Sequence, residues 1–310
     1  MLTLVSSPRF ADHLTPPGHP ESPERADVLA RVAARFAAQG GTVAEPRSAT
    51  DADLLRVHTP AHVAAMVATR GRAVMLDEDT FTSAQSEEVA RLAAGAALTA
   101  VDLVLEGASG ARALALVRPP GHHAESDKPM GFCLYNSVAV GAAHARARGL
   151  ARVAIVDYDV HHGNGTQQIF YEDPSVLFIS SHQHPFWPGS GAADERGRGA
   201  GLGATLNLPL PLGSTDEDVL GRYEREAFPA LERFRPELLL VSAGFDAHAR
   251  DPLAGCRMTT AGLATLTARL VDGATRWCDG RVVLVTEGGY DLATLEACLT
   301  AVIDVAGAPR

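Results

Sequence analysis

The most informative segment of this chain is Val153-Ala-Ile-Val-Asp157-Tyr-Asp159-Val-His161-His-Gly-Asn-Gly165. It begins as an apolar run rich in β-branched residues, and then places Asp157, Asp159 and His161 at every second position before the glycines end the run. Alternate residues of an extended chain share one face with Cα atoms roughly 6.5 Å apart, so two side chains can converge on one cation. The stretch therefore predicts a strand that ends in a metal site, although Asp, Asn and Gly are also the usual residues of a plain polar turn.

Similar apolar runs alternate with helical patterns along the rest of the chain. We expect strands at residues 2–5, 113–117, 152–157, 176–181, 205–211, 237–242 and 282–285. We expect helices at residues 23–39, 51–57, 60–70, 84–105, 136–148, 166–171, 216–233, 260–278 and from 292 onward. This alternation predicts a mostly parallel sheet covered by helices on both faces. Because no linker or internal repeat divides the chain, we predict that residues 1–310 form one α/β domain with three αβα layers.

The composition indicates a globular protein that binds neither nucleic acid nor membranes. Of the 310 residues, 46% are hydrophobic, and the formal net charge of −10 gives no basic field for nucleic acid or anionic lipid. The sequence lacks an 18-residue apolar span, and its first residues lack the regions of a signal peptide, so we expect a cytoplasmic protein. The four cysteines form no C-x-x-C pattern, which predicts free or buried thiols.

Residues able to carry chemistry follow four of the predicted strands. They are His122 and His123 after 113–117, Asp159 and His161 after 152–157, Asp246 after 237–242, and Tyr290 after 282–285. Ligand sites of open α/β sheets lie beyond the carboxyl ends of the strands, and these ends all point the same way in a parallel sheet. We therefore expect these side chains to meet at one site.

Three of them have the character of a catalytic metal site. Asp159, His161 and Asp246 would supply three protein ligands and leave positions open for water and substrate, whereas a structural zinc site usually has four ligands rich in cysteine. Two carboxylates and one imidazole form a harder ligand set than most zinc sites have, so Fe²⁺ and Co²⁺ are alternatives. We predict Zn²⁺.

These residues belong to a set of motifs that resembles a known family. The motifs are Arg118-Pro-Pro-Gly-His-His123, Gly131-Phe-Cys133, Asp157-Tyr-Asp-Val-His-His-Gly-Asn-Gly165, Gly244-Phe-Asp-Ala-His248 and Glu287-Gly-Gly-Tyr-Asp291. In this order they resemble the motifs of zinc-dependent histone deacetylases, with a class II-like character shared by bacterial deacetylases and acetylpolyamine amidohydrolases. The resemblance covers nearly the whole chain. It implies the arginase/deacetylase fold and the hydrolysis of an acyl amide on a primary amine.

The resemblance also implies a role for each polar residue of the site. His123 would be the general base that later protonates the leaving amine, and His122 would support the same water electrostatically. Asp157 matches the carboxylate that orients His122, and Asn164 matches the partner of His123, which is Asp in the class I branch and Asn in the class II branch. Tyr290 matches the phenol that donates to the tetrahedral oxyanion.

A substrate tunnel and two monovalent cation sites, with K⁺ as the expected ion, are further implications of the resemblance. The expected tunnel residues are Gly131, Phe132, Trp187 and Leu253. The first cation site would comprise Asp157, Asp159, His161, Ser180 and Ser181. The second would comprise the backbone carbonyls of Phe170, Asp173 and Val176.

The identity of the substrate is the least determined part of this interpretation. Polyamine-selective relatives carry an acidic residue where this chain has Leu253, which favours acetyl-lysine or a related acylated amine over acetylated polyamines. Glu125, Asp251 or a neighbouring subunit could supply that charge instead, so an acetylpolyamine or other small-molecule amidohydrolase is the alternative. The sequence leaves the oligomeric state open, a homo-oligomer included.

Two other functions fit the sequence less well. An arginase-like ureohydrolase uses two bridged metal ions and needs additional aspartates, but His162 and Asn164 stand in the region where those would lie. A non-catalytic binding module would have lost a metal ligand, His123 or Tyr290, and this chain retains them all.

The remaining histidines are expected to be structural or peripheral. His13 and His19 lie in a proline-rich loop, and we expect both at the surface. His162 follows the candidate ligand His161 but would point to the opposite side of an extended chain, which favours a structural role for His162. His182 and His184 lie near Trp187 in a loop and are candidates for the rim of the tunnel.

Overall fold

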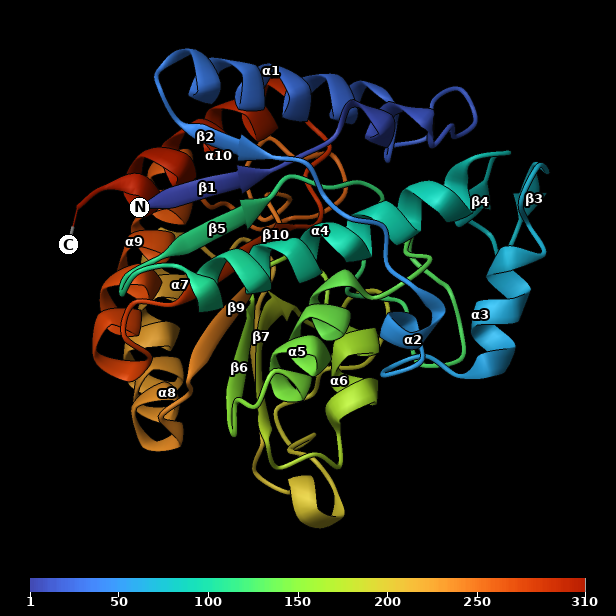
Figure 1. The fold of residues 1–310 in the computed structure, drawn as a ribbon. Helices are drawn as coiled ribbons and strands as arrows, with labels where there is room; N and C mark the ends of the chain where they lie inside the picture. Colours follow the sequence, from blue (N-terminus) through green and yellow to red (C-terminus); the bar gives the residue numbers. More distant parts are fainter. Residues whose placement is uncertain (310) are drawn as a thin grey trace.

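Eight strands form one sheet in the order β2-β1-β5-β10-β9-β6-β7-β8, and every pairing in it is parallel. The computed structural model, which describes residues 1–309, has this sheet at its centre (Figure 1). The strands are β1 (Leu2–Val5), β2 (Thr42–Ala44), β5 (Arg112–Ala115), β6 (Val153–Asp157), β7 (Val176–Gln183), β8 (Thr205–Leu210), β9 (Leu238–Ala243) and β10 (Val282–Thr286). A separate antiparallel hairpin consists of β3 (Val74–Met75) and β4 (Phe81–Thr82).

Helices connect most of these strands. The longer ones are α1 (Glu24–Ala38), α4 (Ser86–Glu106), α5 (Ser137–Ala147), α9 (Thr260–Trp277) and α10 (Leu292–Gly307). The shorter ones are α2 (Asp51–Leu54), α3 (Pro60–Val67), α6 (Asn164–Phe170), α7 (Asp216–Arg222) and α8 (Phe228–Phe234), with 3₁₀ turns at Pro8–Asp12 and Gly199–Gly201 and a π-helical turn at Tyr223–Ala227. Within residues 1–309, the combination of length and apolarity that a membrane-crossing helix requires does not occur.

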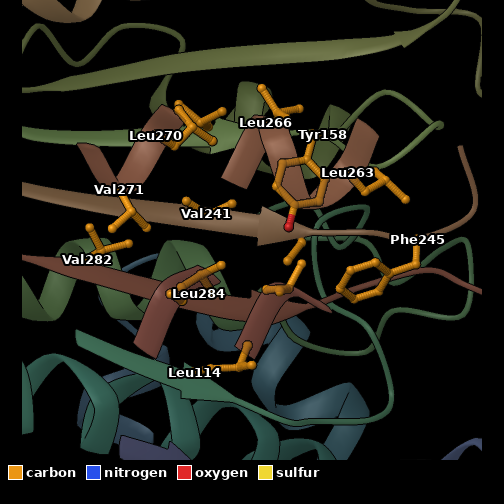
Figure 2. Close-up of a cluster of buried hydrophobic side chains, with 14 of the residues drawn as sticks. Leu114, Tyr158, Val241, Phe245, Leu263, Leu266, Leu270, Val271, Val282 and Leu284 are labelled. Carbon is orange, nitrogen blue, oxygen red and sulfur yellow. The ribbon is translucent and has the colours of Figure 1, made fainter. Parts of the chain in front are cut away.

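Two hydrophobic clusters cover the two faces of the sheet. On one face, α1, α9 and α10 pack against the strands, and Figure 2 shows Leu263 and Leu266 of α9 in the same buried cluster as Val241 of β9 and Leu284 of β10. On the other face, α4 and α5 pack together against the sheet (Figure 1). Strands covered on both sides must be apolar along their whole length, and β6, β9 and β10 are buried at every position. The predicted three-layer α/β fold with a parallel sheet is confirmed.

The structure departs from the predicted elements in a few places. The helix expected at 216–233 is interrupted by the π-helical turn Tyr223–Ala227, which ends just before Pro229. Proline has no N–H to donate to the carbonyl four residues earlier, so the regular hydrogen-bond ladder cannot pass this point. The strand expected to end at 181 continues to Gln183 and takes His182 into the sheet. Strand β2 and the β3–β4 hairpin were not predicted, because they are too short to show a period.

The order of the strands brings the four predicted strand ends together. β5, β10, β9 and β6 are consecutive neighbours in the sheet. The register pairs Asp157 at the end of β6 with Ser242 near the end of β9, so the segments that follow these strands leave the same edge side by side. This edge is where the sequence places its candidate functional residues.

Candidate active site

Asp159, His161 and Asp246 form a compact group of possible metal ligands. Nδ1 of His161 lies 3.0 Å from Oδ2 of Asp246 and 3.3 Å from Oδ1 of Asp159. All three donor atoms lie within 4.8 Å of one another. Ligand atoms at zinc-type distances from a tetrahedral centre are separated by roughly 3.4 Å, so this spacing fits a divalent cation.

Backbone hydrogen bonds orient the two carboxylates of this group. Oδ1 of Asp159 accepts from the N–H of His161 at 2.9 Å, and its Oδ2 accepts from the N–H of Gly288 at 2.8 Å. Oδ1 of Asp246 accepts from the N–H of Val160 at 2.9 Å. Three backbone N–H groups, from residues 160–161 and from Gly288, therefore hold the carboxylates before any cation binds.

Two glycines leave the space that these carboxylates occupy. A Cβ atom on Gly244 would lie 2.1 Å from Oδ2 of Asp159, and one on Gly288 would lie 2.2 Å from Oδ2 of Asp246. Both distances are far below van der Waals contact. The glycines in the Gly244 and Gly288 motifs are therefore required by the close approach of the backbone to the ligand side chains.

Electrostatics favour positive charge at this group. Burial, reinforced by the neighbouring charge of Asp159, raises the pKa of Asp246 to about 7. Burial alone would lower the pKa of His161, but hydrogen bonds to the two carboxylates outweigh burial and raise this pKa to about 10. Two buried carboxylates that attract a proton this strongly will also attract a metal cation, which releases the proton from the imidazole when it binds.

Two adjacent histidines lie beside the ligand group, each with a different partner. Nδ1 of His122 is 2.9 Å from Oδ2 of Asp157, and Nδ1 of His123 is 2.8 Å from Oδ1 of Asn164. Burial alone would lower the pKa of His122, but the charges of Asp157 and Asp159 outweigh burial and raise this pKa to about 10. Burial and the rings of His122 and His161 hold the pKa of His123 well below its ordinary value. The pair thus combines one imidazole with a raised pKa and one with a lowered pKa.

Glu287 fixes the loop that carries these histidines. Its Oε2 accepts from the N–H of Gly121 at 2.6 Å and from the N–H of His122 at 3.2 Å, and its Oε1 accepts from the Ser242 hydroxyl at 3.2 Å. Burial raises its pKa to about 7, and the charge of Asp157 adds to this shift. No role was predicted for Glu287, although a carboxylate directly after a buried strand was a signal for one.

Tyr290 faces the same site from the loop after β10. Its N–H donates to Oδ2 of Asp251 at 2.7 Å, and its ring centroid lies 5.8 Å from that of Phe132. The guanidinium of Arg25 lies 5.1 Å from the centre of the phenol ring. Burial raises the pKa of the Tyr290 phenol well above its ordinary value, even though Arg25 opposes the shift, so the hydroxyl keeps its proton and can donate it.

A pocket of about 210 Å³ leads to these groups. It is lined by Asp79, His123, Gly131, Phe132, His161, Phe186, Trp187, Leu253 and Tyr290. The lining includes all four predicted tunnel residues, with Trp187 40% exposed at the surface. Phe186 and Asp79 were not predicted, and Asp79 lies in the short β3–β4 connection, whose position the sequence does not reveal.

The residues predicted for the monovalent cation sites lie as follows. Asp157 and Ser180 are direct neighbours across β6 and β7, whereas the hydroxyl of Ser181 is 2.9 Å from the Tyr223 hydroxyl in the core. In the second group, the Asp173 N–H donates to the Phe170 carbonyl at 3.0 Å, and the Val176 N–H donates to the Asp173 carbonyl at 3.4 Å. Both sites stay predictions.

Two expectations about the other histidines are wrong. His13 is 1% exposed, and its Nδ1 is 2.6 Å from the Ser86 hydroxyl, because the proline-rich loop folds inward against α4. His182 is buried in β7, where its Nδ1 is 2.9 Å from the hydroxyl of Ser180, and so it does not reach the rim. His19 is half-buried, with its ring 4.8 Å from that of Phe132.

Comparison with known proteins agrees with this geometry. Residues 19–306 match the family described as histone deacetylase domain. The chain is 44% identical over 294 residues to the histone deacetylase-like amidohydrolase of Pseudomonas aeruginosa, an alignment that covers 93% of this chain and 76% of that protein. It is 40% identical over 298 residues to the chloroplastic histone deacetylase 10 of Oryza sativa subsp. japonica, with 90% and 67% covered. The crystal structure of the HDA15 HD domain matches with a TM-score of 0.90 at 38% identity, covering 99% of this chain and 91% of that chain.

Proposed function

The chain belongs to the histone deacetylase family, and from this premise we propose that residues 1–310 are a zinc-dependent deacetylase. The proposed reaction is hydrolysis of the acyl amide of acetyl-lysine or a related acylated amine to a carboxylate and a free amine. The observation that carries the proposal is the meeting of one three-ligand group with His123 and Tyr290 at a single pocket.

Asp159, His161 and Asp246 would hold the metal ion. When bound there, a divalent cation would polarise the acyl carbonyl and acidify a water molecule. Zn²⁺ is the proposed ion, and Fe²⁺ and Co²⁺ are compatible with the same oxygen and nitrogen ligands. Gly244 and Gly288 contribute by leaving room for the carboxylates.

The two histidines and the tyrosine supply the proton chemistry. His123, whose pKa is held low by burial and by the neighbouring imidazoles, would accept the proton of the attacking water and deliver it to the leaving amine nitrogen. His122, held by Asp157, would contribute positive charge beside the water. Tyr290, whose phenol keeps its proton, would donate a hydrogen bond to the oxygen that becomes an oxyanion when water attacks the carbonyl.

The pocket walls suit an acyl group on a flexible apolar stem. Phe132 and Trp187 provide aromatic walls, and Leu253 adds an aliphatic side chain. Such walls would bind the methylene stem of a lysine and exclude bulk water from the amide, which strengthens the electrostatic interactions within the site.

A small cationic substrate, such as an acetylated polyamine, is a second candidate that one observation favours. Asp79 lines the pocket, and an acid at this place would pair with a distal ammonium group. The other two acids considered from the sequence have different partners. Asp251 accepts from the N–H groups of Tyr290 and Leu253, and Glu125 accepts from Asn164.

A rate comparison on one zinc-loaded preparation tests the proposal. The substrates are an acetyl-lysine peptide, N-acetylputrescine and lysine peptides with longer acyl chains, assayed with the wild-type protein and with Asp79→Asn. We expect the acetyl-lysine peptide to have the highest kcat/KM. If N-acetylputrescine is preferred and Asp79→Asn abolishes that preference, the second candidate is correct. Absence of hydrolysis with Zn²⁺, Fe²⁺ and Co²⁺ on all substrates would remove the deacetylase proposal.

A further inference from the structure

The side-chain amide of Asn164 lies between His123 and a group of hydrogen-bond acceptors. Its Oδ1 is 2.8 Å from Nδ1 of His123. Its Nδ2 is 2.9 Å from Oε1 of Glu125, 3.3 Å from Sδ of Met130 and 3.4 Å from the carbonyl oxygen of His123. The two ends of the amide therefore face different chemistry.

These neighbours determine which way the amide points. A carboxylate, a thioether and a carbonyl are all acceptors, and only the NH₂ end of the amide can donate to them. Among the three acceptors, the Glu125 carboxylate forms the strongest bond, because a charged acceptor makes a hydrogen bond roughly twice as strong as a neutral one. Glu125 is therefore the main reason that Oδ1 of Asn164 faces His123.

The orientation of the amide in turn determines the tautomer of His123. Oδ1 can only accept, so Nδ1 of His123 must carry the hydrogen, and the lone pair then resides on Nε2. Nε2 is on the far side of the ring from Asn164, and His123 lines the substrate pocket. The nitrogen able to accept a proton is thereby presented to the substrate.

The backbone holds Glu125 in place for this contact. Its N–H donates to the Lys128 carbonyl at 2.9 Å, and its own carbonyl is 3.0 Å from Nδ1 of His58. Its side chain lines a second pocket of about 440 Å³, together with Asn164, Gln167 and Gln168. This pocket gives the Glu125 carboxylate access to water, so side chains of different charge can be accommodated at position 125.

We propose that Glu125 is a positioning residue of the deacetylase site, whose carboxylate fixes the amide of Asn164 and thereby keeps His123 as the tautomer with its hydrogen on Nδ1. This role rests on the proposed function, because a proton-accepting nitrogen at His123 matters only if the site performs hydrolysis. Glu125 touches neither substrate nor reacting atoms, and it acts through Asn164.

Substitutions at position 125 test whether an acceptor is required there. Glu125→Gln can still present an oxygen to Asn164, so we expect kcat within about threefold of wild type. Glu125→Ala removes the acceptor and should lower kcat about 10-fold, and Glu125→Lys replaces it by a donor and should lower kcat about 100-fold. KM and bound metal should stay unchanged, because the pocket walls and ligands are intact. Equal kcat for all four proteins would overturn the proposal.

Glu172→Ala is the matched control. It removes a carboxylate that is ion-paired with Arg198, a residue at the edge of the same second pocket, but Glu172 has no contact with Asn164. We expect its kcat to equal that of wild type. A loss as large as that of Glu125→Ala would mean that general changes in this region, rather than the contact with Asn164, determine the rate.

A charge exchange gives a sharper test. Asn164→Asp places a second carboxylate beside that of Glu125 and removes the NH₂ group that donates to Glu125. The two like charges repel each other, so activity should fall by at least about 10-fold. Adding Glu125→Lys supplies a donor to the new carboxylate, and the double variant should recover to within about 10-fold of wild type. A double variant with bound metal but no gain over Asn164→Asp would contradict the proposal.

Nitrogen NMR of the histidine rings tests the tautomer without any enzyme assay. In ¹⁵N-histidine-labelled wild-type protein at mildly alkaline pH, His123, identified by the signals lost in His123→Gln, should carry its hydrogen on Nδ1. Glu125→Lys should shift the population toward the tautomer with hydrogen on Nε2. A wild-type spectrum with hydrogen on Nε2 would overturn the proposal. An inactive protein with the expected spectra would instead reject the proposed function and leave the role of Glu125 in place.

Discussion

Nδ1 of His161 lies 3.0 Å from Oδ2 of Asp246, although 85 positions separate the two residues in the chain. The pairing of β6 with β9 produces this contact, because their parallel register brings Asp157 and Ser242 side by side. The loops after these strands then have only a few residues in which to diverge. The candidate metal site is therefore a direct product of the sheet order.

Loss of Asp246 should abolish metal binding. Asp246→Ala removes one of three ligands and also the acceptor for the Val160 N–H, so we expect loss of bound zinc and of activity. Elemental analysis of the purified variant measures this, with circular dichroism to verify folding. Asp304→Ala, at an exposed position of α10, is the control and should bind zinc normally. Unchanged stoichiometry in Asp246→Ala would contradict the ligand assignment.

Loss of the Tyr290 hydroxyl should slow turnover without loss of metal. Tyr290→Phe keeps the ring against Phe132 but removes one donor to the oxyanion. A donor of this kind typically contributes about 10²- to 10³-fold in kcat. Steady-state kinetics and zinc content measured on the same preparation check the prediction. Full activity would remove Tyr290 from the mechanism.

Gly288 should be intolerant of even one added methyl group. In Gly288→Ala, the new Cβ would lie 2.2 Å from Oδ2 of Asp246 and 2.6 Å from Oδ2 of Asp159, so both ligands would have to move. We expect zinc affinity to fall by at least about 10-fold, as metal sites do when ligand orientation is disturbed. Gly221→Ala in α7 is the control, because its Cβ would meet only the flexible end of Arg225. Zinc titration that gives equal affinities for both variants would refute this account.

A buried ion-pair network near the site should contribute strongly to stability. Glu21, 0% exposed, lies 2.8 Å from both Arg25 and Arg118, and these cations hold its pKa well below the ordinary value despite burial. Glu21→Ala leaves two buried guanidinium groups without their counter-charge, which should cost about 3–5 kcal/mol in free energy of unfolding. The partly exposed Glu296, paired with Arg31, provides the control, and Glu296→Ala should cost less than about 1 kcal/mol. Urea denaturation measures both, and similar losses would reject the network's role.

Stability should decline as the pH falls below 6.5. Burial, with His62 nearby, lowers the pKa of His58 from 6.5 to about 3, and burial, with His162 nearby, does the same for His182. Between pH 6.5 and about pH 3, each of these histidines binds a proton in the unfolded chain but not in the folded protein. As the pH is lowered through this range, the free energy of unfolding therefore falls by up to about 1.4 kcal/mol per pH unit for each residue. Above pH 6.5, both histidines are neutral in the folded and in the unfolded protein, so they no longer make the stability depend on pH. Urea denaturation at several pH values should show a smaller slope for His58→Gln, and identical slopes would count against the assignment.

Much of the site was predictable because its signals are local. Asp159 and His161 follow an apolar run at a spacing of two, and Asp246 and Tyr290 follow two further apolar runs. A chain with alternating strands and helices has few ways to arrange itself, and parallel strands direct all their carboxyl ends to one edge. The motif set then restricted the chemistry to that of one family.

Other features could not be predicted because they depend on the path of loops. His13 is buried only because the proline-rich loop turns inward. Asp79 lines the pocket only because of the position of the β3–β4 hairpin. Likewise, Glu125 shows no special pattern in the sequence, and its importance appears only when its carboxylate is seen beside Asn164.

The order of residues was sufficient to predict the class of fold, the residues of the candidate metal site and the histidine pair, because periodicity and short motifs are properties of neighbouring residues. The folded structure was needed to show which acid lines the pocket, which carboxylates hold the active-site loops, and which acceptor orients Asn164. Such contacts join residues that are far apart in the chain, and their energies depend on distances of a few ångströms that the order of residues does not specify.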